Sequence, residues 1–234
     1  MLEDISEKQK NSQIIVTTHN SMIASRLNLN NVLWITEANV NHLSEVDKKV
    51  ADFFIRADDN AFLQLLLSKK AFLVEGATEF LLLPHFYRQF TNKSIEEDGL
   101  SVISCNGISY KKYLEIANKT GKKIAVITDN DKEQNRIDFA KKYNKETTLQ
   151  HIYMADSIDD WTWEICMYNA NKAALNKLIT VQAEAEYKYH GESYGVVPGK
   201  MLNNKVDTAY QMLTSGIVFE IPQYVKDAIE WLRK

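Results

Sequence analysis

The sequence has few of the residues that interrupt or cross-link a chain. Its 234 residues include 3 Pro, 8 Gly and 2 Cys. With so little Pro and Gly, and with no internal repeat, the chain contains no low-complexity linker. Cys105 and Cys166 are too few for a cysteine metal cluster or a disulfide framework. We therefore expect reduced thiols and a cytoplasmic location.

Long apolar runs and an excess of positive charge are also missing. No apolar run approaches the roughly 20 residues that a membrane-spanning helix needs. Residues 1–5 carry acids where an export signal has a basic flank, so we expect neither a membrane span nor export. The formal net charge of -3 gives no overall attraction to nucleic acid. Any contact with nucleic acid must be local, or must use metal ions to offset carboxylates.

From residue 70 onward the sequence alternates apolar runs with amphipathic segments. Strands separated by helices of 10 to 15 residues indicate an α/β fold with a parallel sheet covered on both faces. After Asp156 we expect helices to the C-terminus, interrupted at residues 190–200. We expect strands at 71–75, 100–106, 123–131 and 149–154, and helices at 77–90, 110–119 and 133–143.

The N-terminal stretch follows a different pattern. Residues 13–17 are β-branched and apolar, which predicts a short buried strand, and Ser21 could cap a following helix. Residues 31–40 alternate as a strand, and residues 44–70 favour a helix. With so few elements around which to build a core, this stretch is typical of the last piece of a larger domain.

Acidic residues follow two of the predicted strands. Glu75 ends the first strand and Asp129 and Asp131 end the third, while Glu79 opens the helix after Glu75. In parallel α/β sheets, ligands bind beyond the carboxyl ends of the strands. The alternation of side chains in a strand predicts that Asp129 and Asp131 point the same way and Asn130 the opposite way. If the two strands are neighbours, Glu75, Asp129 and Asp131 converge at one edge.

Carboxylates so close together cannot all ionise without a counterion, and oxygen ligands suit Mg²⁺ or Mn²⁺ rather than zinc. We expect Glu75 and Glu79 to face that cation together. Each acid also has a simpler explanation, since a strand-end Asp often forms a turn or caps a helix. Glu79 alone is explained as a charge in the first helical turn. The conjunction of the two acidic motifs favours the metal site.

The motifs "LVEGATE" and "VITDND" resemble the two motifs of the Toprim domain, which is found in topoisomerases, primases and certain nucleases. The resemblance implies that Glu75, Asp129 and Asp131 bind Mg²⁺ during phosphodiester chemistry. The wider chain resembles the overcoming-lysogenization-defect (OLD) family of nucleases, which includes the nuclease subunit of the Gabija anti-phage system. These proteins join an ABC-type ATPase to a C-terminal Toprim domain, and Glu79 is typical of this branch.

The same resemblance divides the chain. The stretch "QIIVTTHNSMIAS" resembles the end of such an ATPase, with His19 at the position of the switch histidine. We therefore expect residues 1–66 to be the C-terminal remnant of an ABC-type ATPase domain. Residues 67–234 would form the Toprim nuclease domain, with a four-stranded, mainly parallel sheet and a C-terminal helical part.

Two further elements of the family have weaker matches. "DDWTWE" resembles a Ser/Thr-x-Glu element through Thr162 and Glu164, and implies that Glu164 serves a second metal ion. Asp159 or Asp160 could supply a nearby aspartate. A helix-start acid beside a capping threonine is the alternative. "NKVDTAYQML" resembles the segment that carries the family's C-terminal lysine, here Lys205, for which a surface lysine is the alternative.

The departures from the family bear on nucleotide binding. The sequence has no G-x-x-x-x-G-K-[ST] phosphate loop, no ABC signature and no aspartate-glutamate pair before the predicted strand at 13–17. His19 therefore has no nucleotide-binding partners in this sequence. We expect ATP to bind only if a missing ATPase part, or another polypeptide, completes the site.

Together these features predict an Mg²⁺-dependent endodeoxyribonuclease that uses two metal ions, with DNA as its substrate and a role in anti-phage defence. The expected metal ligands are Glu75, Glu79, Asp129, Asp131 and Glu164, and the expected catalytic residues are Glu75 and Lys205. The resemblance also implies a homodimer and a helicase-like or ATPase partner. The alternative is a non-catalytic regulatory or assembly module built on a Toprim scaffold.

Overall fold

The computed structural model describes residues 15–18, 33–35, 40–42, 60–105, 109–180 and 187–234. The chain divides into two compact units, residues 1–63 and 64–234. Among the described residues, no helix is long and apolar enough to cross a membrane.

In the first unit, strand β1 (Leu33–Ile35) pairs antiparallel with β2 (Val40–His42). The single strand predicted over 31–40 is therefore wrong, because these residues contribute to two strands of a small sheet. The buried strand predicted over 13–17 is also wrong for its described part. Residues 15–17 are irregular and Ile15 is 79% exposed; a strand needs a hydrogen-bonded neighbour, and no described strand pairs with them.

The structure describes few of the residues that relate the first unit to an ATPase. His19 and Ser21 lie outside the described residues. Of the helix predicted over 44–70, the structure describes α4 (Asn60–Leu67). The assignment of residues 1–66 to an ATPase remnant stays a prediction.

The second unit contains the predicted parallel sheet. Its strands are β3 (Lys70–Val74), β4 (Leu100–Ser104), β5 (Lys123–Ile127) and β6 (Gln150–Tyr153). Their order is β4-β3-β5-β6, and all three pairings are parallel. The expectation that the first and third strands are neighbours is confirmed. The α/β fold with a four-stranded sheet is likewise confirmed.

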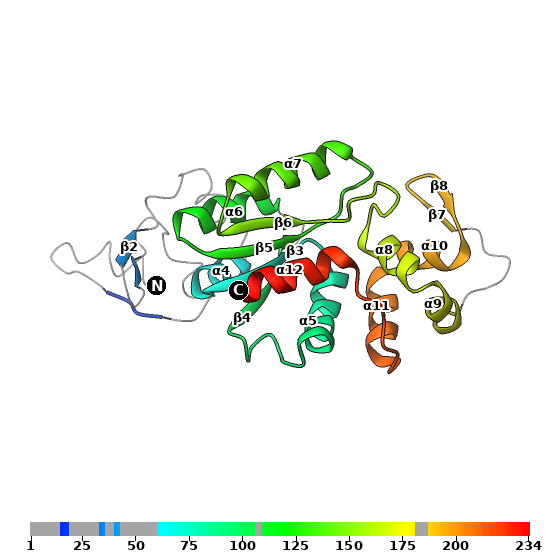
Figure 1. Cartoon of the computed structure of the whole chain (residues 1–234). Coiled ribbons are helices and arrows are strands. Elements are labelled where there is room, and N and C mark those ends of the chain that lie inside the picture. The colour runs from blue at the N-terminus through cyan, green and yellow to red at the C-terminus, as the bar shows by residue number, and fades with distance from the viewer. Residues whose placement is uncertain (1–14, 19–32, 36–39, 43–59, 106–108, 181–186) are drawn as a thin grey trace, which may run out of the picture. The chain divides into compact units, whose positions relative to one another are not determined.

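Helices cover both faces of this sheet, with α6 and α7 on one face and α5 and α12 on the other (Figure 1). The sequence predicts an interruption of the helices at 190–200. The structure has a two-stranded hairpin there, β7 (Tyr187–Tyr189) and β8 (Glu192–Tyr194), and the next helix begins at Val196. The helices are α5 (Ala77–Thr91), α6 (Tyr110–Lys119), α7 (Gln134–Glu146), α8 (Trp163–Ala170), α9 (Lys172–Leu178), α10 (Val196–Asn203), α11 (Lys205–Thr214) and α12 (Gln223–Arg233).

The main core lies between the sheet and the helices on the α5 and α12 face. Helix α12 turns one apolar face inward, and its residues Val225, Ala228, Ile229 and Leu232 are fully buried. They share one cluster with Phe72 of β3 and with side chains of α5 and α8. Burying the larger of these side chains, Val225, Ile229 and Leu232, stabilises a fold by about 1.5–3 kcal/mol each.

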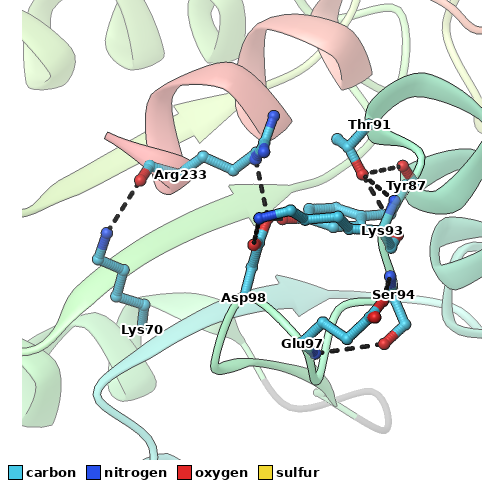
Figure 2. Close-up of polar contacts among 8 residues, drawn as sticks. All are labelled: Lys70, Tyr87, Thr91, Lys93, Ser94, Glu97, Asp98 and Arg233. Carbon is cyan, nitrogen blue, oxygen red and sulfur yellow. Dashed lines mark hydrogen bonds and ion pairs between the residues drawn. The ribbon is translucent and has the colours of Figure 1, made fainter.

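A group of polar contacts around Asp98 fastens the end of α12 (Figure 2). The Asp98 carboxylate accepts hydrogen bonds from Tyr87 Oη at 2.5 Å, Lys93 Nζ at 3.1 Å and Arg233 Nε at 2.9 Å. Lys70 Nζ donates to the Arg233 carbonyl at 3.2 Å. The hydrogen bond from Tyr87, with those from Lys93 and Arg233, lowers the pKa of Asp98 to about 2. The last helix is thereby tied to the connection between α5 and β4.

Candidate metal centre

The register of the sheet brings the two acidic motifs together. Val74 at the end of β3 lies opposite Ile127 at the end of β5. Glu75 and Thr128 follow these residues at the carboxyl edge, where ligands bind in parallel sheets. From this edge the acidic side chains reach two different groups of partners.

The first group, which we call the acidic centre, consists of Glu79, Asp129, Glu164 and Lys205. Glu79 and Glu164 stand in the first turns of α5 and α8 and are only 5% and 2% exposed. Lys205 is the first residue of α11. The acidic centre thus joins the ends of four elements that are far apart in the sequence.

Specific hydrogen bonds hold these carboxylates in place. Asp129 Oδ1 accepts from the backbone N–H of Trp163 at 2.8 Å, at the N-terminal end of α8. Glu164 Oε1 accepts from Thr78 Oγ1 at 3.2 Å, and its Oε2 lies 3.0 Å from Lys205 Nζ. Donors at a helix start favour negative charge there. The three carboxylates nevertheless face a single ammonium group.

The crowding of these acids perturbs their proton affinity. Burial, and then the negative charge of Glu164, raise the pKa of Glu79 from 4.5 to about 7. Burial and the charges of Glu79 and Glu164 raise the pKa of Asp129 well above its ordinary value. Burial would lower the pKa of Lys205, but Glu164 and Asp129 outweigh it and raise that pKa. Lys205 therefore stays positively charged, but this one charge does not balance three ionised carboxylates.

Gly76 explains how Glu79 fits beside the strand end. A Cβ atom at Gly76 would lie 2.4 Å from Glu79 Oε2, closer than nonbonded atoms approach. The backbone of Gly76 has φ -112 and ψ 166, which any residue adopts. The glycine therefore leaves space for the Glu79 carboxylate, and a side chain at this position would have to displace that carboxylate.

The second group of partners surrounds Arg136 of α7. Its Nη1 pairs with Asp131 Oδ2, and its Nη2 lies 3.9 Å from Glu75 Oε1 and 3.2 Å from Thr128 Oγ1. Asp129 belongs to the acidic centre, whereas Asp131 and Glu75 are paired with a cationic side chain. Arg136 was not foreseen from the sequence, because nothing in its local pattern marks it.

The predicted strand over 123–131 is too long, and this corrects the geometry expected for the two aspartates. Strand β5 ends at Ile127, and Asp131 and Lys132 have left-handed backbones with φ 52 and φ 64. Because the alternation of side chains holds only in an extended strand, it does not apply to Asp131. Asp129 and Asp131 accordingly have different partners.

Asn130, between the two aspartates, fixes this loop. Its side chain is completely buried. Its Nδ2 donates to the carbonyls of Ala155 at 3.1 Å and Ser157 at 2.9 Å, and its Oδ1 accepts from the backbone N–H of Lys132 at 3.0 Å. Asn130 therefore positions Asp129 and Asp131, a role that sequence reasoning missed.

The residues of "DDWTWE", at the start of α8, have different roles. Thr162 caps α8, since its Oγ1 accepts from the N–H of Ile165 at 3.3 Å. Glu164 is both a first-turn acid and a member of the acidic centre. Asp160 accepts from Asn169 Nδ2 at 2.6 Å and Asp159 is exposed, so neither is among the acids that surround Lys205.

Part of the second unit matches a known family. The model for the overcoming lysogenization defect protein-like TOPRIM domain matches residues 66–131. This segment is an OLD-like Toprim domain. It contains β3, β5 and both acidic motifs, whereas Glu164 and Lys205 lie beyond it.

Several solved structures resemble part of the chain. The C-terminal region of the Burkholderia pseudomallei OLD protein is 16% identical, with a TM-score of 0.47 over 71% of this chain and 98% of that one. The C-terminal region of the Xanthomonas campestris pv. campestris OLD protein is 15% identical, with a TM-score of 0.46 over 73% and 94%. No curated protein matches the chain.

Toprim domains generally bind divalent metals, and the donors of the acidic centre suit such ions. Glu79, Asp129 and Glu164 offer hard carboxylate oxygens, which favour Mg²⁺ or Mn²⁺ over zinc. In the part of the chain that the structure describes, no three His, Cys, Asp or Glu side chains stand as a ready-made metal site. Lys205 and Arg136 supply the positive charge here. The predicted metal ligands stay predictions.

Proposed function

We propose that this chain is the nuclease module of an OLD-type protein and hydrolyses phosphodiester bonds of DNA with the help of divalent cations. The observation that carries the proposal is the acidic centre itself. Three carboxylates, one from the loop after β5 and one each from α5 and α8, lie around one lysine at the carboxyl edge of a Toprim sheet. Such an excess of buried negative charge is costly without a cation.

The residues of the chain divide the work of the reaction. Glu79, Asp129 and Glu164 would hold one divalent ion, and Glu75 and Asp131 a second one. Bound ions would lower the pKa of a water molecule and stabilise the leaving oxygen. Thr78 and the N–H of Trp163 orient two of the carboxylates through their hydrogen bonds, as outer partners of metal ligands do.

Lys205 acts on the phosphate. Its ammonium group is held charged by Glu164 at 3.0 Å and lines the same pocket as Asp129 and Asp131. A fixed cation there offsets the negative charge that develops on the phosphoryl group, and removing one such donor typically lowers the rate about 100- to 1,000-fold.

The test is cleavage of supercoiled plasmid by the purified chain in Mg²⁺, in Mn²⁺ and in EDTA. We expect cleavage only with a divalent ion, its loss in Asp129→Asn, and a strongly reduced single-turnover rate in Lys205→Ala. Asp156→Asn is the matched control, because Asp156 is 81% exposed and pairs with Lys141 on the surface. If calorimetry detects no divalent ion binding and no variant differs from wild type, the assembly-module alternative is correct instead.

A further inference from the structure

The hairpin formed by β7 and β8 builds an aromatic wall. Its two-residue turn, His190 and Gly191, has positive φ at both positions, as the tightest hairpin turn requires. Tyr187 packs closely on α10, since a Cβ at Gly199 would lie 2.3 Å from Tyr187 Cβ. This contact fixes the hairpin to α10.

On the anchored hairpin, two tyrosines approach a tryptophan. The ring centres of Tyr189 and Tyr194 lie 5.9 Å and 6.0 Å from that of Trp161. Trp161 precedes α8 and is largely buried, whereas both tyrosines are only partly buried. The three rings, which we call the aromatic wall, therefore keep ring surface available to a ligand.

A pocket of about 330 Å³ is lined both by the aromatic wall and by Asp129 and Lys205 of the acidic centre. Asp131, Lys132 and residues of the hairpin also line it. Lys132 Nζ lies 5.0 Å from the centre of the Trp161 ring, paired with Glu192, and Lys205 Nζ lies 5.8 Å from that of Tyr189. Two ammonium groups thus lie beside the aromatic wall, in a pocket that carboxylates also line.

We propose that this pocket binds one nucleotide of a DNA single strand, with its base against the aromatic wall and its phosphate at Lys132 and Lys205. This inference rests on the proposed nuclease function, and it names the substrate as single-stranded or frayed DNA. The pocket volume is near the low end of the roughly 300–1,000 Å³ of ligand sites, which suits one nucleotide. Aromatic rings beside a positive groove bind single strands irrespective of sequence, because every base has a stacking face. In a duplex the bases are stacked on one another and cannot enter.

The experiment measures binding without cleavage. Fluorescein-labelled oligothymidylate and a blunt duplex of equal length are titrated with the chain in EDTA and in Ca²⁺, with fluorescence anisotropy as the readout. We expect the wild-type chain to prefer the single strand. The double variant Tyr189→Leu/Tyr194→Leu should lose about tenfold in single-strand affinity, as expected when base stacking is removed, with duplex affinity unchanged.

Two controls separate stacking from a loss of folding. Tyr210→Leu removes a tyrosine of α11 that is 61% exposed and does not line the pocket, so it should bind like wild type. Tyr189→Phe keeps the ring and should retain affinity. Equal affinity of the wild type for the two DNAs, or unchanged affinity in the double variant, overturns the proposal.

Failure of the pocket and failure of the nuclease proposal give different results. If the chain binds single strands selectively through the tyrosines but does not cleave DNA in Mg²⁺, the pocket proposal is supported and the nuclease proposal is rejected. Cleavage in Mg²⁺ that the double variant performs normally at limiting single-stranded substrate supports the nuclease and removes the pocket.

Discussion

Glu79→Gln should stabilise the protein in the absence of metal, and the effect should depend on pH. The substitution keeps the shape of the side chain and removes the charge that Glu164 and burial oppose. The pKa of Glu79 is raised from 4.5 to about 7. At about 1.4 kcal/mol for each tenfold change in proton affinity, the ionised form costs the folded state about 3 kcal/mol.

The direction of the pH effect follows from the raised pKa. Below pH 4.5 Glu79 is protonated in both the folded and unfolded chains, so it costs nothing. Between pH 4.5 and about 7 the unfolded chain loses this proton and the folded chain keeps it, so stability falls as the pH rises. Above about pH 7 the full cost is present. The Gln variant lacks this dependence and should match wild type at pH 4 but exceed it by up to about 3 kcal/mol at pH 8.

Urea denaturation followed by circular dichroism at pH 4, 6 and 8 in EDTA measures this difference. Glu146→Gln is the matched control, since Glu146 is 61% exposed at the end of α7 and pairs with Lys142 at 3.8 Å; a surface pair of this kind contributes at most about 1 kcal/mol. Saturating Mg²⁺ should stabilise wild type more than the Glu79→Gln variant. Parallel stability curves for wild type and Glu79→Gln across the pH range would refute the reasoning.

Three further substitutions test the surroundings of the site. Gly76→Ala should displace the Glu79 carboxylate and weaken Mg²⁺ binding in calorimetry about 10- to 100-fold; unchanged affinity would contradict the packing argument. Asn130→Asp removes buried donors to Ala155 and Ser157 and should lower the free energy of unfolding by about 1–3 kcal/mol, which a urea midpoint equal to wild type would disprove. Because the pKa of Asp98 is lowered to about 2, its stabilisation is present above pH 3.8 and lost as the pH falls through 2. Between pH 4 and pH 2 the melting temperature of Asp98→Asn should therefore fall less than that of wild type, and equal falls would exclude this role.

The core of the fold could be predicted because its local and global patterns agree. The alternation of apolar strands with helices from residue 70 gives every strand of the parallel sheet, and α6 (Tyr110–Lys119) has the predicted bounds. The prediction that the acids meet at one edge required β3 and β5 to be neighbours. The pairing of Val74 with Ile127 shows that they are. The sequence pattern could not supply that adjacency, since strand order depends on how the crossing helices pack.

Two features of the site depended on backbone geometry that the sequence pattern does not reveal. The strand pattern predicts that the side chains of Asp129 and Asp131 point the same way. They do not, because β5 ends before them and the backbones of Asp131 and Lys132 are left-handed. The hairpin was read as an interruption between helices. Its signal was the dipeptide His190-Gly191 between tyrosine-rich segments, a turn sequence with Gly at its second position. Short strands of three residues are too brief for a period to stand out.

The two cationic side chains at the carboxyl edge link stability to activity. Lys205 pairs with Glu164, and Arg136 pairs with Asp131 and lies near Glu75, so each compensates part of the charge that a divalent ion would otherwise balance. Removing Lys205 leaves the buried carboxylate of Glu164 uncompensated, which costs stability, whereas Asp131 is 49% exposed and solvent screens its charge. In the proposed nuclease Lys205 faces the phosphate once metal ions balance the acids. On this proposal the folded protein without metal needs the positive charge of Lys205 against Glu164, and the reacting complex needs the same charge against the phosphate.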